Sequence, residues 1–144
     1  MTDPTTDAPA EYGDFPLRRF LGMELTGDQP GVGVAHVDVG PDHLNPNGVV
    51  HGAVLFALVD TAMGKSTMGV VDEPGSYCAS IEVALRFIRP AVGGRLTATA
   101  TVVKRGRSVV HLEARVVGDG DRLVATAAGT FAILSASPDS SARR

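Results

Sequence analysis

The stretch NPNGVVHGAVLFALVDTAMG, residues 45–64, decides the fold of this chain. A polar turn leads into the pair His51-Gly52, and an almost unbroken apolar run follows. A helix that is apolar on every side must be enclosed by other structure rather than lie on a surface. Asp60 interrupts the run, and an ionisable acid in such a helix is costly unless it is partnered or used. The stretch therefore predicts an enclosed helix, over residues 52–68, that carries a functional site.

The size and charge of the chain exclude several classes of protein. Its 144 residues suffice for one domain with one substantial core. A net charge of −3, without a basic stripe, gives no reason to expect nucleic acid. The one cysteine, Cys78, allows no intrachain disulfide, and the acidic N-terminus is no targeting peptide. No apolar run is long enough to span a bilayer, so we expect a cytoplasmic protein without membrane association.

The flanking sequence predicts an antiparallel sheet around the helix. Residues 15–134 form the expected domain, between disordered tails at residues 1–14 and 135–144 that are rich in polar residues. Alternating apolar and polar residues predict strands at residues 32–39, 77–89, 96–103, 109–117 and 123–134. The last four are separated by short turns, which indicates a meander of antiparallel neighbours. Such a sheet bent around one long helix is the α+β arrangement called the hotdog fold. Its second face would carry Ala, Val and Thr, so we expect the chain to associate.

The motifs of the chain resemble those of one enzyme family. The spacing of Asn45, His51-Gly52 and Asp60, with the later runs Ser80-Ile81-Glu82 and Arg89-Pro90-Ala91, resembles that of hotdog-fold acyl-CoA thioesterases. The branch that includes phenylacetyl-CoA thioesterase and the human thioesterase superfamily member two is the most similar. The resemblance covers residues 21–134. The family usually has His-Gly-Gly where this chain has Ala53, which we expect to reshape the pocket wall.

Gly52 and Asp60 are suited to attack on a thioester. The Gly52 N–H lies at the positive end of the helix dipole, without a partner inside the helix, where it can stabilise an oxyanion. The alternative is a glycine that merely eases the start of the helix. Asp60 would activate water or attack directly; the alternative is an exposed acid paired with Lys65 or an arginine. Either mechanism of attack stays open.

The distance between these two residues predicts a shared site. Eight helical residues separate Gly52 from Asp60, a rise of about 12 Å. A donor and an acid serving one carbonyl must both lie within roughly 3 Å of it. The acid should therefore come from a neighbouring subunit, which makes a homodimer the catalytic unit, and the resemblance implies the same. We further expect a homotetramer, as a dimer of dimers whose arrangement the sequence leaves open.

The resemblance implies roles for further residues. Asn45 would hold the thioester or the attacking water, although turn formation before Pro46 competes with that role. His51 would orient its loop through a ring hydrogen bond, and Ser80 would help Asp60 to position water. The hairpin tip, otherwise a solvated turn, would meet the nucleotide and phosphates of coenzyme A. The implied substrate and CoA contacts are Lys104, Arg105, Gly106, Arg107, Ser108, Val109, Glu82 and Phe87.

These features together predict an acyl-CoA thioesterase that acts on an aryl or medium-chain acyl-CoA. We expect no metal or redox cofactor, because the histidines and Cys78 lack metal-ligand spacing, and coenzyme A enters as part of the substrate. The absence of a G-x-S-x-G motif argues against a serine hydrolase. Two alternatives remain: a hotdog enoyl-CoA hydratase and a non-catalytic acyl-CoA sensor. The acyl group is open, because Phe56, Leu58, Met63 and Met68 suit either a pocket or the core.

Overall fold

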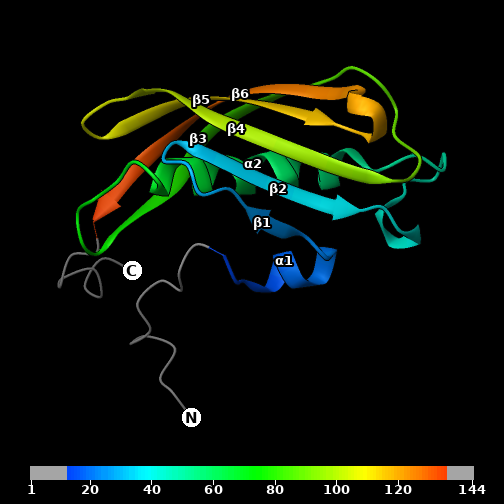
Figure 1. Cartoon of the computed structure of the whole chain (residues 1–144), viewed down its shortest axis with the longest axis horizontal. Helices are drawn as coiled ribbons and strands as arrows, with labels where there is room; N and C mark the ends of the chain where they lie inside the picture. Colours follow the sequence, from blue (N-terminus) through cyan, green and yellow to red (C-terminus); the bar gives the residue numbers. More distant parts are fainter. Residues whose placement is uncertain (1–12, 136–144) are drawn as a thin grey trace, which may run out of the picture.

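A six-stranded antiparallel sheet curls around one long helix in the computed structural model, which describes residues 13–135 (Figure 1). The strands lie side by side in the order β1-β2-β4-β5-β6-β3, so the predicted hotdog fold is confirmed. The elements are α1 (Pro16–Leu21), β1 (Glu24–Thr26), β2 (Val32–Asp38), α2 (Gly52–Met68), β3 (Ser76–Phe87), β4 (Arg95–Arg105), β5 (Val109–Val117) and β6 (Leu123–Ser135). Two single-turn 3-10 helices lie at Pro41–His43 and Asp119–Asp121.

Helix α2 has the predicted bounds, and its buried side fills the curl of the sheet. Leu58, Val59 and Met63 are fully buried, and the helix packs most extensively on β2, β4 and β3. The sheet approaches closely because two strand residues lack side chains. A Cβ at Gly33 would collide with the Ala62 carbonyl oxygen, and a Cβ at Gly129 would press on the Met63 sulfur. Glycine at these positions lets the helix sit directly on the sheet.

One side of α2 is not covered by any other part of residues 13–135. Ala53 is exposed and Phe56 is 43% exposed, on the side of the helix that also carries the half-buried Asp60. The composition of the helix predicts that other structure encloses it on every side. Within the described residues the sheet covers part of the circumference and leaves an apolar stripe open, so any further cover comes from outside residues 13–135.

The order of the strands also differs from the predicted meander. Strands β4, β5 and β6 are successive antiparallel neighbours, but β3 pairs with β6 and forms the edge of the sheet. The link from β3 to β4, residues 88–94, crosses the intervening strands. These seven residues reach about 23 Å when extended, and the gap across three strand spacings is about 14 Å. Turn residues between two strands therefore allow a hairpin without requiring one.

Smaller differences concern the ends of the elements. The short strand β1 was not predicted, and β3 ends at Phe87, two residues before the predicted end. Most of the two predicted tails lies outside the described residues. Within residues 13–135, no helix is long and apolar enough to cross a membrane.

Candidate active site

The loop before α2 holds the start of the helix in a defined place. The Asn45 side-chain oxygen accepts hydrogen bonds from the backbone N–H groups of Asn47 and Val49, at 2.9 and 3.2 Å. The Val50 N–H donates to the Ala91 carbonyl at 2.8 Å, which ties the loop to the link after β3. The Asn45 oxygen is therefore engaged in turn formation, the alternative that competes with a direct catalytic role.

His51 supports the first turn of α2. Its backbone is extended, and its ring Nδ1 accepts a hydrogen bond of 2.9 Å from the Ala53 N–H. This caps one of the donors that a helix N-terminus leaves without a partner. This ring hydrogen bond stabilises the first turn of the helix, and His51 Nδ1 is its acceptor.

Gly52 leaves an unpaired donor beside a hollow. No group within residues 13–135 accepts a hydrogen bond from its backbone N–H. A hollow of about 400 Å³ lies next to it, lined in part by Asn45, Leu55, Phe87 and Arg89. The Phe87 ring packs so close that a Cβ on Gly52 would lie 3.0 Å from its Cζ. The helix dipole adds positive potential at this end, so the arrangement suits a developing oxyanion.

Asp60 has the properties of a general base or nucleophile. Its Oδ1 is buried without a hydrogen-bond partner in the described part of the chain. Burial raises the pKa of the Asp60 carboxyl, and a hydrogen bond from the Ser80 hydroxyl opposes part of that rise. Burial, together with the charge of Asp60, raises the pKa of the neighbouring Cys78 thiol to about 11. The thiol therefore stays protonated at neutral pH, which leaves Asp60 as the basic group here.

The donor and the acid belong to two separate groups in the single chain. Gly52 lies against Phe87 near the end of β3, whereas Asp60 faces Ser80, seven residues earlier on that strand. Along α2 their backbones are about 12 Å apart. Asp60 does not line the hollow beside Gly52. One described chain thus does not bring both groups to one carbonyl.

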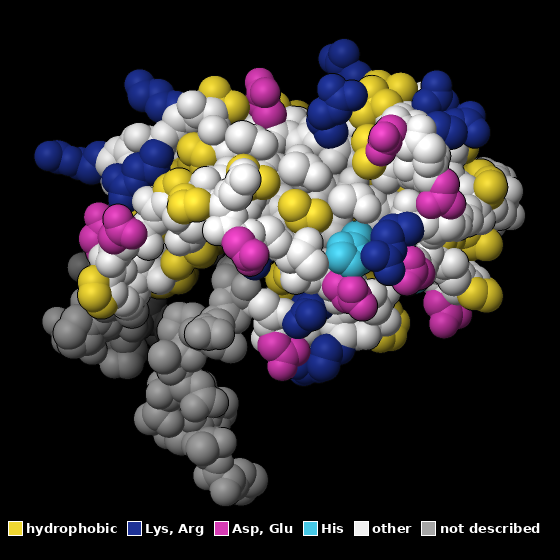
Figure 2. Space-filling view, viewed as in Figure 1, with side chains coloured by type: hydrophobic (Ala, Val, Ile, Leu, Met, Phe, Trp, Pro, Cys, Tyr) yellow, Lys and Arg dark blue, Asp and Glu magenta, His cyan; other side chains and the backbone are white. Residues whose placement is uncertain are grey.

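The predicted CoA contacts lie mainly at the far end of the molecule. The β4–β5 hairpin lies beyond the C-terminal end of α2, where Arg105 pairs with Glu73 at 3.3 Å. Figure 2 shows basic side chains gathered at the end where Figure 1 places this hairpin. Its backbone is tied down, because the Gly106 N–H donates to Val109 and the Ser108 carbonyl accepts from Ile133. Lys104 and Arg107 form no ion pair with any described residue, so their charges are available.

The remaining predicted contacts, Glu82 and Phe87, lie at different places along β3. Glu82 is exposed and pairs with Thr130 next to the β3 bulge, so it lies apart from Gly52, whereas Phe87 lines the hollow. Among residues 13–135, no three His, Cys, Asp or Glu side chains lie together as a metal site would require. The candidate pocket residues also divide: Leu58 and Met63 are core, and Phe56 is at the surface. Sequence reasoning missed Leu55 and Arg89 as lining residues, although Arg89 stands in a motif that was noticed.

A match to a sequence profile shows to which protein family the chain belongs. The sequence profile of the thioesterase superfamily matches residues 47–125, more than half of the chain. The chain belongs to the thioesterase superfamily. The matched segment contains both Gly52 and Asp60, so the two candidate groups lie within the part that defines this superfamily.

Members of the superfamily resemble the chain over most of its length. The Mycobacterium tuberculosis protein named "Putative esterase Rv1847" is 29% identical over 125 residues, 85% of this chain and 89% of that protein. A structure of a mutant of the thioesterase SAV0944 from Staphylococcus aureus has a TM-score of 0.78 and 27% identity, covering 81% of this chain and 97% of that one. The E. coli PaaI protein has a TM-score of 0.76 and 25% identity, covering 84% and 86%. These similarities support a hydrolase.

Proposed function

We propose that the protein hydrolyses an acyl-CoA thioester to a free acid and coenzyme A. Two features of α2 carry the proposal: the N–H at its start has no partner among the described residues, and the buried Oδ1 of Asp60 on the same helix has none either. A relative from Listeria monocytogenes, 23% identical over 117 residues (81% of this chain and 94% of the relative), is named 1,4-dihydroxy-2-naphthoyl-CoA hydrolase. That name supports an aryl-CoA as the substrate, and a medium-chain acyl-CoA is the other substrate class that we propose to test.

Each group has one role in the proposed reaction. The Gly52 N–H holds the carbonyl oxygen and stabilises its negative charge as the tetrahedral intermediate forms. Asp60 either takes a proton from water that adds to the carbonyl carbon or adds to that carbon itself. Ser80 steers the carboxylate, and the carbon–sulfur bond then breaks. The thiolate leaves as coenzyme A and takes up a proton, and in the nucleophilic route water cleaves the acyl-Asp60 anhydride.

The active unit in this proposal is a homodimer formed through the edge strand β3. Within residues 13–135, no strand pairs with the outer edge of β3, which carries apolar side chains that include Ile81 and Phe87, each 60% exposed. A long apolar edge next to an open helix stripe is a surface on which a second copy can add its own β3. Antiparallel pairing centred between Val83 and Ala84 would set Ser80 of one copy opposite Phe87 of the other.

That register brings the two groups of the site together. Asp60 lies beside Ser80 and Gly52 lies beside Phe87, so pairing Ser80 with the second copy's Phe87 moves the acid of one chain toward the donor of the other. Each dimer then contains two composite sites. The same pairing also covers Phe56 and the rest of the open α2 stripe. A dimer of such dimers would form the tetramer, and the basic hairpin with Lys104 and Arg107 would contribute to binding of the CoA phosphates.

Mixed dimers test both the reaction and the shared site. Gly52→Pro removes the donor and Asp60→Asn removes the acid, so each variant alone should be inactive on a panel of phenylacetyl-, benzoyl-, hexanoyl- and palmitoyl-CoA. Refolding the two together pairs intact Gly52 with intact Asp60 in one of two sites of every mixed dimer. Random pairing should then restore about one quarter of wild-type activity.

The outcomes of this experiment separate the alternatives. No recovery in the mixture, with mixed dimers confirmed by mass spectrometry, would refute the composite site. Tight binding of acyl-CoA without turnover by the wild-type protein would instead support a sensor. Two samples of the wild-type protein, mixed and refolded in the same way, are the control for activity lost during refolding.

A further inference from the structure

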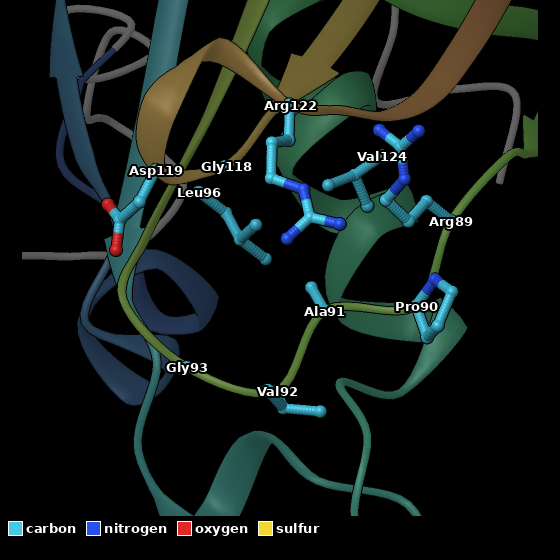
Figure 3. A pocket seen from close by; sticks show the side chains of 10 residues that line it. All are labelled: Arg89, Pro90, Ala91, Val92, Gly93, Leu96, Gly118, Asp119, Arg122 and Val124. Atoms are coloured by element: carbon cyan, nitrogen blue, oxygen red, sulfur yellow. The ribbon is translucent and has the colours of Figure 1, made fainter.

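A second hollow, of about 300 Å³, adjoins the one beside Gly52 (Figure 3). It lies between the link after β3 and the turn that joins β5 to β6. Arg89, Pro90 and Ala91 line both hollows, so the two are neighbours along the link. A molecule bound at Gly52 therefore lies close to the residues that border this second space.

Two arginines supply positive charge to the second hollow. Arg89 donates from Nη1 to the Leu123 carbonyl at 3.2 Å, which anchors its guanidinium on the wall. Figure 3 shows the Arg122 side chain extending into the space above Ala91, on the same side of the hollow as Arg89. Neither arginine forms an ion pair with any carboxylate of the described residues. Two uncompensated cations thus flank one concave surface.

The acid that lines this hollow does not neutralise the pair. Asp119 Oδ1 accepts a hydrogen bond of 3.3 Å from the Arg95 N–H, and its carboxylate lies on Gly94. Figure 3 shows that carboxylate on the opposite side of the hollow from the two guanidinium groups, pointing away from them. The chain as a whole carries a net charge of −3, so this local excess of positive charge does not follow from the general composition.

We propose that Arg89 and Arg122 form an oxyanion subsite that binds a carboxylate or phosphate group of the substrate. The planar guanidinium offers paired N–H donors that match both groups, and charge-assisted bonds of this kind are the strong ones. The effect of this subsite on turnover rests on the proposed thioesterase function, whereas anion binding by the two arginines does not depend on that function. Arg122 is a binding residue here, with no part in the attack on the thioester.

The position of the subsite favours a carboxylate carried by the acyl group. Arg89 lies two residues after Phe87, about 7 Å along an extended chain. A thioester carbonyl at Gly52 would therefore lie a short acyl chain away from the subsite. The phosphates of coenzyme A are separated from the thioester by the whole pantetheine arm. We accordingly expect acyl groups with a terminal carboxylate, such as succinyl, glutaryl or adipoyl, to be preferred over neutral acyl groups of equal length.

Binding titrations test the subsite without relying on turnover. Succinate, glutarate, adipate, 3′,5′-ADP and coenzyme A are titrated into the full-length wild-type protein and Arg122→Gln by calorimetry. Arg115→Gln, at an exposed arginine of β5, is the matched control. The exposed Arg122 should be replaced without loss of the fold, which thermal melting checks, and Arg89→Gln gives a second, independent variant. We expect Arg122→Gln to weaken one class of anion by about tenfold or more, as loss of a hydrogen bond to a charged group does.

The pattern of losses identifies the source of the anion. Weaker binding of the dicarboxylates alone assigns the subsite to the acyl group, and weaker binding of 3′,5′-ADP and coenzyme A alone assigns it to the phosphates. Kinetics with glutaryl-CoA and pentanoyl-CoA should then show a rise in KM for the charged substrate only. Equal affinity of wild type, Arg122→Gln and Arg89→Gln for every anion would overturn the proposal, whatever the turnover. Anion binding that depends on Arg122 in a protein without turnover would refute the thioesterase function alone.

Discussion

Replacing Gly52 by proline removes one hydrogen atom of the proposed oxyanion site while leaving the helix intact. Gly52 is the first residue of α2, the position where proline is tolerated because its N–H has no partner in the helix. The preceding residue, His51, has φ −62° and ψ 137°, which is the extended conformation that a following proline requires. The Ala53 N–H keeps its bond to the His51 ring. The variant should therefore fold with the donor deleted.

Gly52→Ala is the matched control because it adds the same Cβ and keeps the N–H. In both variants the Cβ lies 3.0 Å from Cζ of Phe87, so any shift of that ring is common to the two proteins. Loss of one oxyanion donor typically lowers kcat by a factor of about 10² to 10³, or roughly 2.7–4 kcal/mol of transition-state stabilisation. We expect that loss for the proline variant relative to the alanine variant, measured as CoA release under saturating substrate.

The comparison is informative only if both variants are folded and equally assembled. Circular dichroism, thermal melting and size-exclusion chromatography establish that for each. A proline variant whose kcat stays within severalfold of the alanine variant would refute the assignment of the Gly52 N–H. Equal loss in both variants would instead show that the space beside Phe87, and not the donor, limits activity.

Three further predictions concern the acid, its neighbour and the basic hairpin. Asp60→Asn should lower kcat by about 10² to 10⁴-fold, and wild-type kcat should rise with pH through the Asp60 pKa, which burial places above that of an ordinary aspartate. Because the Asp60 pKa is raised in the folded state, ionised Asp60 lowers the stability of the fold once the pH exceeds the pKa of the unfolded chain. Asp60→Asn should therefore raise Tm at pH 7 but not at pH 3. An unchanged Tm at pH 7 would contradict the burial argument. The charge of Asp60 helps to raise the Cys78 pKa to about 11, so Asp60→Asn should speed alkylation of Cys78 by iodoacetamide at pH 8 to 9. An equal rate of alkylation in both proteins would argue against close electrostatic contact between Asp60 and the Cys78 thiol. Replacing Lys104 and Arg107 together by glutamine should raise KM for acyl-CoA but not for the acyl-pantetheine thioester, and an equal rise for both would place the hairpin away from the phosphates.

The pattern of apolar residues predicted the elements because their signals are local. The bounds of α2 follow from the cap at His51 and the uninterrupted apolar run after it. The alternation of Thr97, Thr99 and Thr101 with buried neighbours sets the two faces of β4. Strand pairing is not local: the sequence of the link after β3 predicted a hairpin, but two other strands, β5 and β6, lie between the strands that it joins. The curl of the sheet around α2 decides which strands can meet.

Some candidate site residues also have local signals in the sequence, and others do not. Gly52 and Asp60 stand out in the sequence because a helix start and an acid in an apolar run each have a physical signature. Arg122 has none, since its role depends on a turn that packs near Arg89, thirty-three residues earlier in the chain.

The sequence by itself determined the central helix, five of the six strand segments, and the positions of the candidate donor and acid, because each depends on spacing along one segment. Only the tertiary structure decided that β3 is a free edge, that one stripe of α2 is open, and that Arg89 and Arg122 share a hollow. These features arise where segments distant in sequence meet, and the geometry of that meeting depends on how the whole sheet curls around the helix.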